Sequence, residues 1–162
     1  MAWTSICDIC DGKCCKDKEL EGSIRGKRYY IENKLDILLV EDNIVCQKIT
    51  SKFLEKLNAK VSIASNGQEA INLASSKKFD CILMDKEMPI MDGYQATRTL
   101  RNLGNFGVII GLTGNAIKED IDEFKNHGVN TVLTKPLNIK LFVETLKDLN
   151  IIDEFSSRKL SK

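Results

Sequence analysis

Five residues of the chain have side chains suited to holding a divalent cation and accepting a phosphoryl group. They stand at the ends of short apolar runs, or directly before a proline: Glu41, Asp42, Asp85, Thr113 and Lys135. Carboxylates gathered in one place raise one another's pKa unless a positive charge neutralises them. Mg²⁺ prefers oxygen ligands and keeps several waters, so two carboxylates, a backbone carbonyl and water are enough to hold it.

The same five side chains contain the parts needed for phosphoryl transfer to a carboxylate. Asp85 would be the nucleophile. The cation and Lys135 would offset charge on the phosphoryl oxygens, and Thr113 would donate a hydrogen bond to a further oxygen. Taken singly, such residues are most often solvated loop acids, surface lysines or satisfied strand-end hydroxyls. The prediction therefore depends on all five lying at one place.

Five apolar runs alternate with five helical patterns and would bring these positions together. The predicted strands are residues 36–40, 60–64, 80–84, 108–112 and 129–134, and the predicted helices begin near residues 43, 67, 92, 117 and 139. This alternation predicts a doubly wound α/β fold with a five-stranded parallel sheet and helices on both faces, and we expect the flavodoxin-like order 2-1-3-4-5, one of the common orders of such folds. Ligands bind such folds beyond the carboxyl ends of the strands, where the five side chains would meet.

The first helix carries a start signal and an apolar pattern. Asn43 is suited to be its N-cap. Four apolar residues recur at helical spacing and predict the face that packs on the sheet: Val45, Ile49, Phe53 and Leu57. Cys46 in this helix and Cys81 in the third strand are predicted to be buried small apolar side chains.

The predicted domain organisation has three parts. Residues 1–34 read as a flexible, cysteine-containing N-terminal extension, residues 35–150 as the folded domain and residues 151–162 as a C-terminal tail. Four cysteines cluster in the extension, at Cys7, Cys10, Cys14 and Cys15. A zinc site, free thiols and reversible palmitoylation all stay open for them.

The composition of the 162 residues is 43% hydrophobic and 29% charged, with a formal net charge of +1. This profile predicts a soluble globular protein and gives no electrostatic reason to expect nucleic acid as a partner. No apolar run approaches the roughly 20 residues of a membrane helix, and acids stand where a signal peptide would be apolar. We expect an intracellular monomer, in the cytoplasm with the nucleus as a further compartment, and no membrane contact.

Four motifs in fixed order and spacing resemble the receiver domains of response regulators. They are VEDN at residues 40–43, MDKEMPIMDG at residues 84–93, LTG at residues 112–114 and TKP at residues 134–136, and the resemblance covers roughly residues 35–149. The resemblance implies that the folded domain is a receiver domain. It would accept a phosphoryl group from a phosphohistidine, with Mg²⁺ as cofactor.

The resemblance also implies a role for each matching residue. Asp85 would be the phosphoacceptor and a metal ligand, Asp42 a direct Mg²⁺ ligand, Glu87 a ligand through its backbone carbonyl and Glu41 a ligand through water. Thr113 would be the switch hydroxyl and Lys135 the cation that pairs with phosphate. The peptide between Lys135 and Pro136 would be cis.

Within the family, the run 83–89 and the lack of an attached output domain look most like the stand-alone plant receivers of type C. That likeness implies phosphate transfer from a histidine-containing phosphotransfer protein or a hybrid histidine kinase, in a cytokinin-type two-component relay. Two departures bear on the signalling state: Val132 holds no aromatic ring, and Gly114 is smaller than usual, which should leave the phosphoryl group more open to water.

Other functions compete with this reading. The chain could work mainly as a phosphohistidine phosphatase or phosphate sink, accepting phosphate and hydrolysing it rapidly. A haloacid-dehalogenase-like phosphatase needs Asp-x-Asp after its first strand, whereas Asp85 follows the third. A flavodoxin-like cofactor binder would have a phosphate loop where Glu41 and Asp42 stand. A pseudo-receiver that only binds partners would not require the complete set.

Overall fold

The computed structural model describes residues 28–31, 33–152 and 157–160. The chain divides into two compact units, Tyr29–Arg158 and the two ends Met1–Arg28 and Lys159–Lys162. The four clustered cysteines at positions 7–15 lie outside the described residues. The boundaries predicted at residues 34 and 150 stay a prediction, but two short strands, β1 (Arg28–Ile31) and β7 (Ser157–Leu160), occur where no element was expected and pair with each other.

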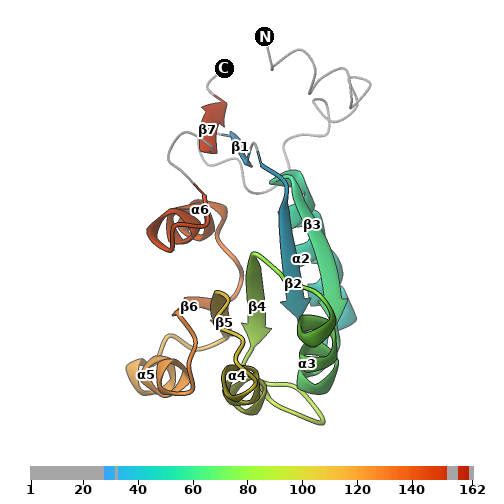
Figure 1. Cartoon of the computed structure of the whole chain (residues 1–162). Coiled ribbons are helices and arrows are strands. Elements are labelled where there is room, and N and C mark those ends of the chain that lie inside the picture. Colours follow the sequence, from blue (N-terminus) through green and yellow to red (C-terminus); the bar gives the residue numbers. More distant parts are fainter. Residues whose placement is uncertain (1–27, 32, 153–156, 161–162) are drawn as a thin grey trace. The chain divides into compact units, whose positions relative to one another are not determined.

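The Tyr29–Arg158 unit is built on a five-stranded sheet. Its strands are β2 (Leu35–Val40), β3 (Ala59–Ala64), β4 (Cys81–Asp85), β5 (Ile109–Thr113) and β6 (Thr131–Thr134). All neighbours are parallel, in the order β3-β2-β4-β5-β6. Counted along the chain, this is the predicted order 2-1-3-4-5. It brings the carboxyl ends of β2, β4, β5 and β6 to one edge (Figure 1).

Five helices connect the strands: α2 (Ile44–Lys56), α3 (Gly67–Ser76), α4 (Gly93–Asn102), α5 (Lys118–Asn126) and α6 (Ile139–Asp148). One apolar cluster joins one face of the sheet to buried residues of α2 and α6, and a second joins the other face to α3, α4 and α5. Alternate strand residues supply the two clusters, as Leu39 and Leu38 show. Helices cover both faces, as predicted. No helix in the described ranges is both long and apolar enough to cross a bilayer.

Side-chain caps fix where the helices begin. Asn43 accepts hydrogen bonds from the backbone N–H groups of Val45 and Cys46, and Asp92 accepts one from Gln95. Such caps satisfy backbone donors that the first helical turn leaves without partners. Because α2 starts at Ile44 and β2 ends at Val40, only three residues connect them, and two of those are the predicted acids at 41 and 42.

The sequence prediction of the sheet-facing side of α2 is wrong at Val45 and Ile49, whereas Phe53 is partly buried and packs against the core, as predicted. The helix buries Gln47, Ser51 and Leu54, whereas Val45 is 63% exposed and Ile49 is 65% exposed. Positions 47, 51 and 54 recur at spacings of four and three, so they share the sheet-facing side, and Val45 and Ile49, two positions before 47 and 51, point to the other side. Leu57, just beyond the helix, is buried as predicted.

The two cysteines within the described residues differ in burial. Cys81 is fully buried in β4, as predicted, and this burial raises the pKa of its thiol. Cys46 is only partly buried and faces a surface pocket, so the prediction of a buried side chain is wrong for it.

Candidate functional site

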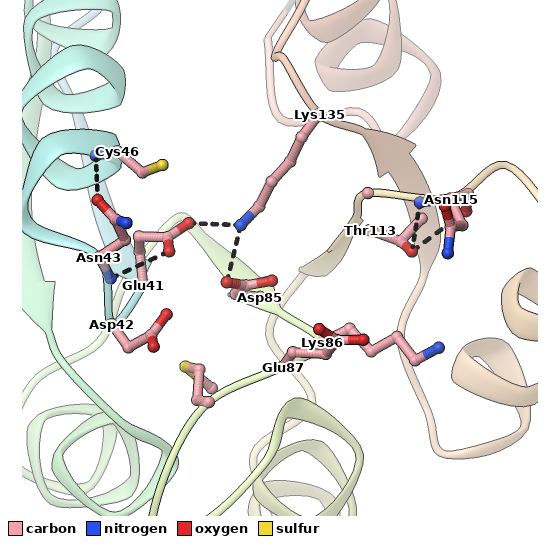
Figure 2. A pocket seen from close by; sticks show the side chains of 12 residues that line it. Glu41, Asp42, Asn43, Cys46, Asp85, Lys86, Glu87, Thr113, Asn115 and Lys135 are labelled. Carbon is pink, nitrogen blue, oxygen red and sulfur yellow. Dashed lines mark hydrogen bonds and ion pairs between the residues drawn. The ribbon is translucent and has the colours of Figure 1, made fainter.

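A pocket of about 610 Å³ opens at the edge of the sheet where the carboxyl ends of the strands meet. It lies between the ends of β2 and β4, where the strand order reverses. The five predicted residues all line it, together with Glu87, and so do residues of the intervening loops (Figure 2): Asn43, Cys46, Lys86, Met88, Gly114 and Asn115. The topology therefore brings together side chains that are up to 94 positions apart in the sequence.

Lys135 makes the central ion pairs of the pocket. Its Nζ lies 2.6 Å from Glu41 Oε2 and 2.8 Å from Asp85 Oδ2, and it stands between the two in Figure 2. Both carboxylates are nearly buried, at 3% and 5% exposure, so this ammonium is what makes their burial tolerable. Partial burial acts to lower the pKa of Lys135, but the two carboxylates outweigh it and raise that pKa. The amine therefore stays charged throughout the neutral range.

The backbone of Lys135 is fixed by the neighbouring strand. Its N–H donates to the carbonyl of Thr113 at 2.8 Å, and its peptide bond to Pro136 is cis, as the resemblance implied. Since β6 lies two strands from β4, the side chain must extend across the end of β5 to reach Asp85. The ammonium thus connects β6 to both acidic strand ends.

Asp42 is the one acid of the three that forms no ion pair with Lys135. It is exposed, and its carboxylate takes part in no hydrogen bond or ion pair within the described part of the chain. One oxygen from each of Glu41, Asp42 and Asp85 lies within 4.8 Å of the others. Lys135 offsets one of the three carboxylates, so two formal negative charges remain. An all-oxygen donor set with this charge fits a hard divalent cation such as Mg²⁺.

The end of β4 is braced so that Asp85 stays in place. The N–H of Lys86 donates to Leu112 in β5, and the N–H of Gly93 donates back to the carbonyl of Lys86, both at 3.0 Å. A Cβ at position 93 would collide with the carbonyl oxygen of Asp85. Gly93 is therefore needed for the close approach of the following loop as well as for starting α4.

Thr113 lines the pocket, but its hydroxyl forms its hydrogen bonds with the backbone of Asn115 and not with Asp85. The hydroxyl donates to the carbonyl of Asn115 at 3.1 Å and accepts from the Asn115 N–H at 3.2 Å, as drawn in Figure 2. To donate to a group on Asp85, it would have to leave Asn115. Between them in sequence, Gly114 offers open space, because an added Cβ would meet no atom within 4 Å.

Two further polar residues at the site were not identified from the sequence. Lys86, beside Asp85, directs its ammonium to Asp120 at 2.9 Å, and this hydrogen bond is the main reason that the pKa of Lys86 is raised. Gln47 lies under the loop that carries the acids and donates to the carbonyl of Glu41 at 2.6 Å. A polar residue at an inward position of α2 would have been the signal, but it becomes visible only once the buried face is known.

Comparison with known proteins gives consistent matches. The family model described as the response regulator receiver domain matches residues 37–147. Two-component response regulator 24 from Arabidopsis thaliana is 41% identical over 120 residues, which are 74% of this chain and 86% of that protein. The next seven relatives are longer, and the chain spans 24% or less of each.

Two of the solved structures that resemble the chain are receiver domains. One is the receiver domain of Ssk1 from Saccharomyces cerevisiae, solved with the histidine phosphotransfer protein Ypd1, with a TM-score of 0.69, 26% identity and coverage of 78% of this chain and 97% of that one. The other is the receiver domain of sensor histidine kinase PA1611 from Pseudomonas aeruginosa, with Mg²⁺ coordinated in its active-site cleft. It has a TM-score of 0.66, 36% identity and coverage of 72% and 97%.

Removing the central ammonium should destabilise the metal-free chain. We expect Lys135→Met to lower the free energy of unfolding by roughly 2 to 3 kcal/mol, because two nearly buried carboxylates lose their partner. The cost should fall below that of a fully buried pair, since 30% of the Lys135 side chain is exposed. Mg²⁺ should stabilise the variant more than the wild type, because the variant has one more negative charge to offset.

Urea unfolding with chelator and with Mg²⁺ measures both effects. Lys140→Met is the matched control, since that lysine forms an exposed pair with Glu144 at 3.9 Å. Equal stabilisation of Lys135→Met and wild type by Mg²⁺ would mean that the cation and the ammonium do not share these acids.

Proposed function

Because the chain belongs to the response regulator receiver domain family, we propose that it accepts a phosphoryl group on Asp85 from a phosphohistidine donor. The observation that carries this proposal is the surroundings of Asp85. It is nearly buried at the end of β4, forms an ion pair with Lys135, and has a carboxylate oxygen within 4.8 Å of those of Glu41 and Asp42. A structural aspartate would be satisfied by neighbours without needing an open pocket lined by two further carboxylates.

The reaction transfers phosphorus from nitrogen to oxygen. The P–N bond of the phosphohistidine breaks as a carboxylate oxygen of Asp85 forms a bond to phosphorus, and the imidazole nitrogen keeps the electron pair. Lys135, already 2.8 Å from the carboxylate, would pair with an oxygen of the arriving group. Thr113 would donate to another oxygen after releasing the carbonyl of Asn115.

Mg²⁺ is the cofactor that the donor set favours. Asp42, Asp85 and the backbone carbonyl of Glu87 would hold it directly, and Glu41 would contact it through water. When bound, the ion supplies positive charge that stabilises the phosphoryl oxygens during transfer. The three carboxylates have one ammonium among them, so negative charge remains for a cation to offset, and Asp42 is exposed; both observations support this assignment. The Mg²⁺ coordinated by the PA1611 receiver domain supports it as well.

A protein donor is favoured by the surface beside the pocket. Ile44, Val45 and Ile49 form an α2 apolar face and are 64%, 63% and 65% exposed. The neighbouring residues Asn43 and Cys46 line the pocket, so the α2 apolar face borders it. Exposed apolar surface of this kind marks an interaction site, and an amphipathic helix of a partner could bury it. The donor would be a histidine-containing phosphotransfer protein or a hybrid histidine kinase.

The biological setting is a further part of the proposal. The resemblance to type C plant receivers and the match to an Arabidopsis response regulator support a cytokinin-type two-component relay. We place the chain inside the cell, in the cytoplasm and the nucleus, and treat it as a monomer that does not bind nucleic acid.

Rapid loss of phosphate is a second function that one observation favours. Gly114 lines the pocket beside Thr113 and leaves open space there, through which water could reach a group on Asp85. Water attack on phosphorus would release inorganic phosphate and restore the carboxylate. The chain would then act as a phosphate sink or a phosphohistidine phosphatase.

Substitution of the acceptor tests the main proposal. Incubated with a labelled histidine phosphotransfer protein and Mg²⁺, the wild type should take up one phosphoryl group, whereas Asp85→Asn should take up none, because an amide is not a competent nucleophile here. Chelation of Mg²⁺ should slow transfer strongly. Asp122→Asn, at an exposed position of α5, is the matched control. Labelling that survives in Asp85→Asn would refute the assignment.

The α2 apolar face should matter for the protein donor alone. We expect Val45→Glu and Ile49→Glu to slow transfer from the phosphotransfer protein at least tenfold, because each buries a charge on docking. Labelling by acetyl phosphate, which needs no docking, should be unchanged. Phe106→Glu is the control, since Phe106 is also exposed, at 84%, but lies in the loop before β5, at the far end of the strands. An equal slowing with both donors would place the defect in the pocket.

Filling the space at position 114 should prolong the phosphorylated state. We expect Gly114→Ala to lengthen the half-life of the acyl phosphate several-fold, because a methyl group there would obstruct water without a clash. The decay of label after removal of the donor gives the half-life, and Gly107→Ala serves as a control remote from the pocket. An unchanged half-life, or no release of inorganic phosphate beyond the amount of chain present, would count against the sink.

A further inference from the structure

We propose that Gln47 is a positioning residue for the Mg²⁺ ligand Asp42, an inference that rests on the proposed function. Gln47 lies on the sheet-facing side of α2 and is only 9% exposed. Its side-chain Nε2 donates to the carbonyl of Glu41 at 2.6 Å and to Ser65 Oγ at 3.3 Å. The amide is buried on the same side of α2 as Ser51 and Leu54, and a buried amide of this size calls for a physical reason.

The orientation of the amide follows from its partner. A backbone carbonyl can only accept a hydrogen bond, so the nitrogen of the Gln47 amide, and not its oxygen, must face Glu41. The backbone N–H of Gln47 donates to the carbonyl of Asn43 at 2.9 Å. Gln47 therefore holds the carbonyls of both residues that flank Asp42, one through its side chain and one through its backbone.

The remaining bonds of the loop hold the same two flanking residues. The N–H of Glu41 donates to the carbonyl of Ala64 at 3.0 Å, and the N–H of Asn43 donates to Glu41 Oε1 at 3.2 Å. Asp42 differs from its neighbours, because its carboxylate has no hydrogen-bond partner among the described residues. Its position at the pocket is therefore set by the peptide units on either side, and Gln47 fixes the one that precedes it.

Loss of the Gln47 amide should act on the metal site more than on the fold. The Glu41–Asp42 peptide would lose its anchor, and Asp42 would no longer be held at one distance from Asp85. Removing groups that orient metal ligands without touching the metal typically reduces metal affinity 10- to 100-fold. Glu41 would keep its side-chain bond to Lys135, so the ion pairs of the pocket would persist.

The test is Mg²⁺ binding by the full, unphosphorylated chain. Gln47→Met keeps the length of the side chain and removes the donor, and we expect the Mg²⁺ dissociation constant to rise about tenfold, measured by calorimetry or by amide shifts in NMR titration. Gln47→Glu places an acceptor against the Glu41 carbonyl and should weaken binding further. In the metal-free protein, the amide of Asn43 should exchange hydrogen faster in both variants than in the wild type.

Two controls separate positioning from general instability. Gln68→Met removes an amide that, among the described residues, bonds only to Asn72, on the exposed surface of α3, and should change neither Mg²⁺ binding nor the exchange of the Asn43 amide. Leu54→Ala removes packing from the same buried face of α2 and should destabilise the fold while leaving the Mg²⁺ dissociation constant within twofold. Gln47→Met that binds Mg²⁺ as tightly as wild type, or no more weakly than Leu54→Ala, overturns the inference.

The outcome is independent of the phosphotransfer assay. If Asp85→Asn is still labelled but Gln47→Met weakens Mg²⁺ binding, the proposed phosphoacceptor is wrong and Gln47 still positions the cation site. If Asp85 is the acceptor and Gln47→Met binds Mg²⁺ normally, only the role of Gln47 is wrong.

Discussion

Repulsion among the carboxylates at one edge of the sheet is the constraint on which the site depends. Glu41 directly follows β2, Asp85 ends the neighbouring strand β4, and both are nearly buried, which would be too costly for two carboxylates without a nearby positive charge. The lysine that pairs with both directly follows β6, two strands away from Asp85, and its backbone N–H donates to Thr113 in the strand between. The parallel sheet thus makes the site possible, because only its carboxyl edge brings these strand ends together.

The fold could be predicted from the sequence because local signals and long-range order agree. Strand and helix patterns alternate strictly, and that alternation leaves few topologies open. The caps at Asn43 and Asp92 are local, so they too were readable. The buried side of α2 could be predicted only in part. A hydrophobic period identifies an apolar stripe but does not say whether the stripe meets the sheet or a partner, and α2 directs Val45 and Ile49 to the surface.

The site could be predicted as a set of residues but not as a set of bonds. Strand ends determine which side chains meet, so the acids, Thr113 and Lys135 were expected to line one pocket. That Lys135 would share its charge with Glu41, or that Thr113 would bond to Asn115, depends on side-chain positions that become fixed only when the strands are assembled. The roles of Gln47 and Lys86 were hidden for the same reason, since each depends on a partner in a distant segment or on the unknown buried face.

The two sides of α2 explain why its pattern misled. The outward side presents the α2 apolar face beside the pocket, and the inward side presents a buried amide to the loop that carries the acids. A helix that served only the core would have its apolar residues inside and its polar residues outside. This first turn of α2 reverses that arrangement at two positions, 45 and 47, on either side of Cys46, which lines the pocket. Departures from a simple amphipathic pattern are expected where a helix serves a site as well as a core. The helix that follows the acids thus contributes to the pocket from two directions, by contact with a donor and by the geometry of the cation site.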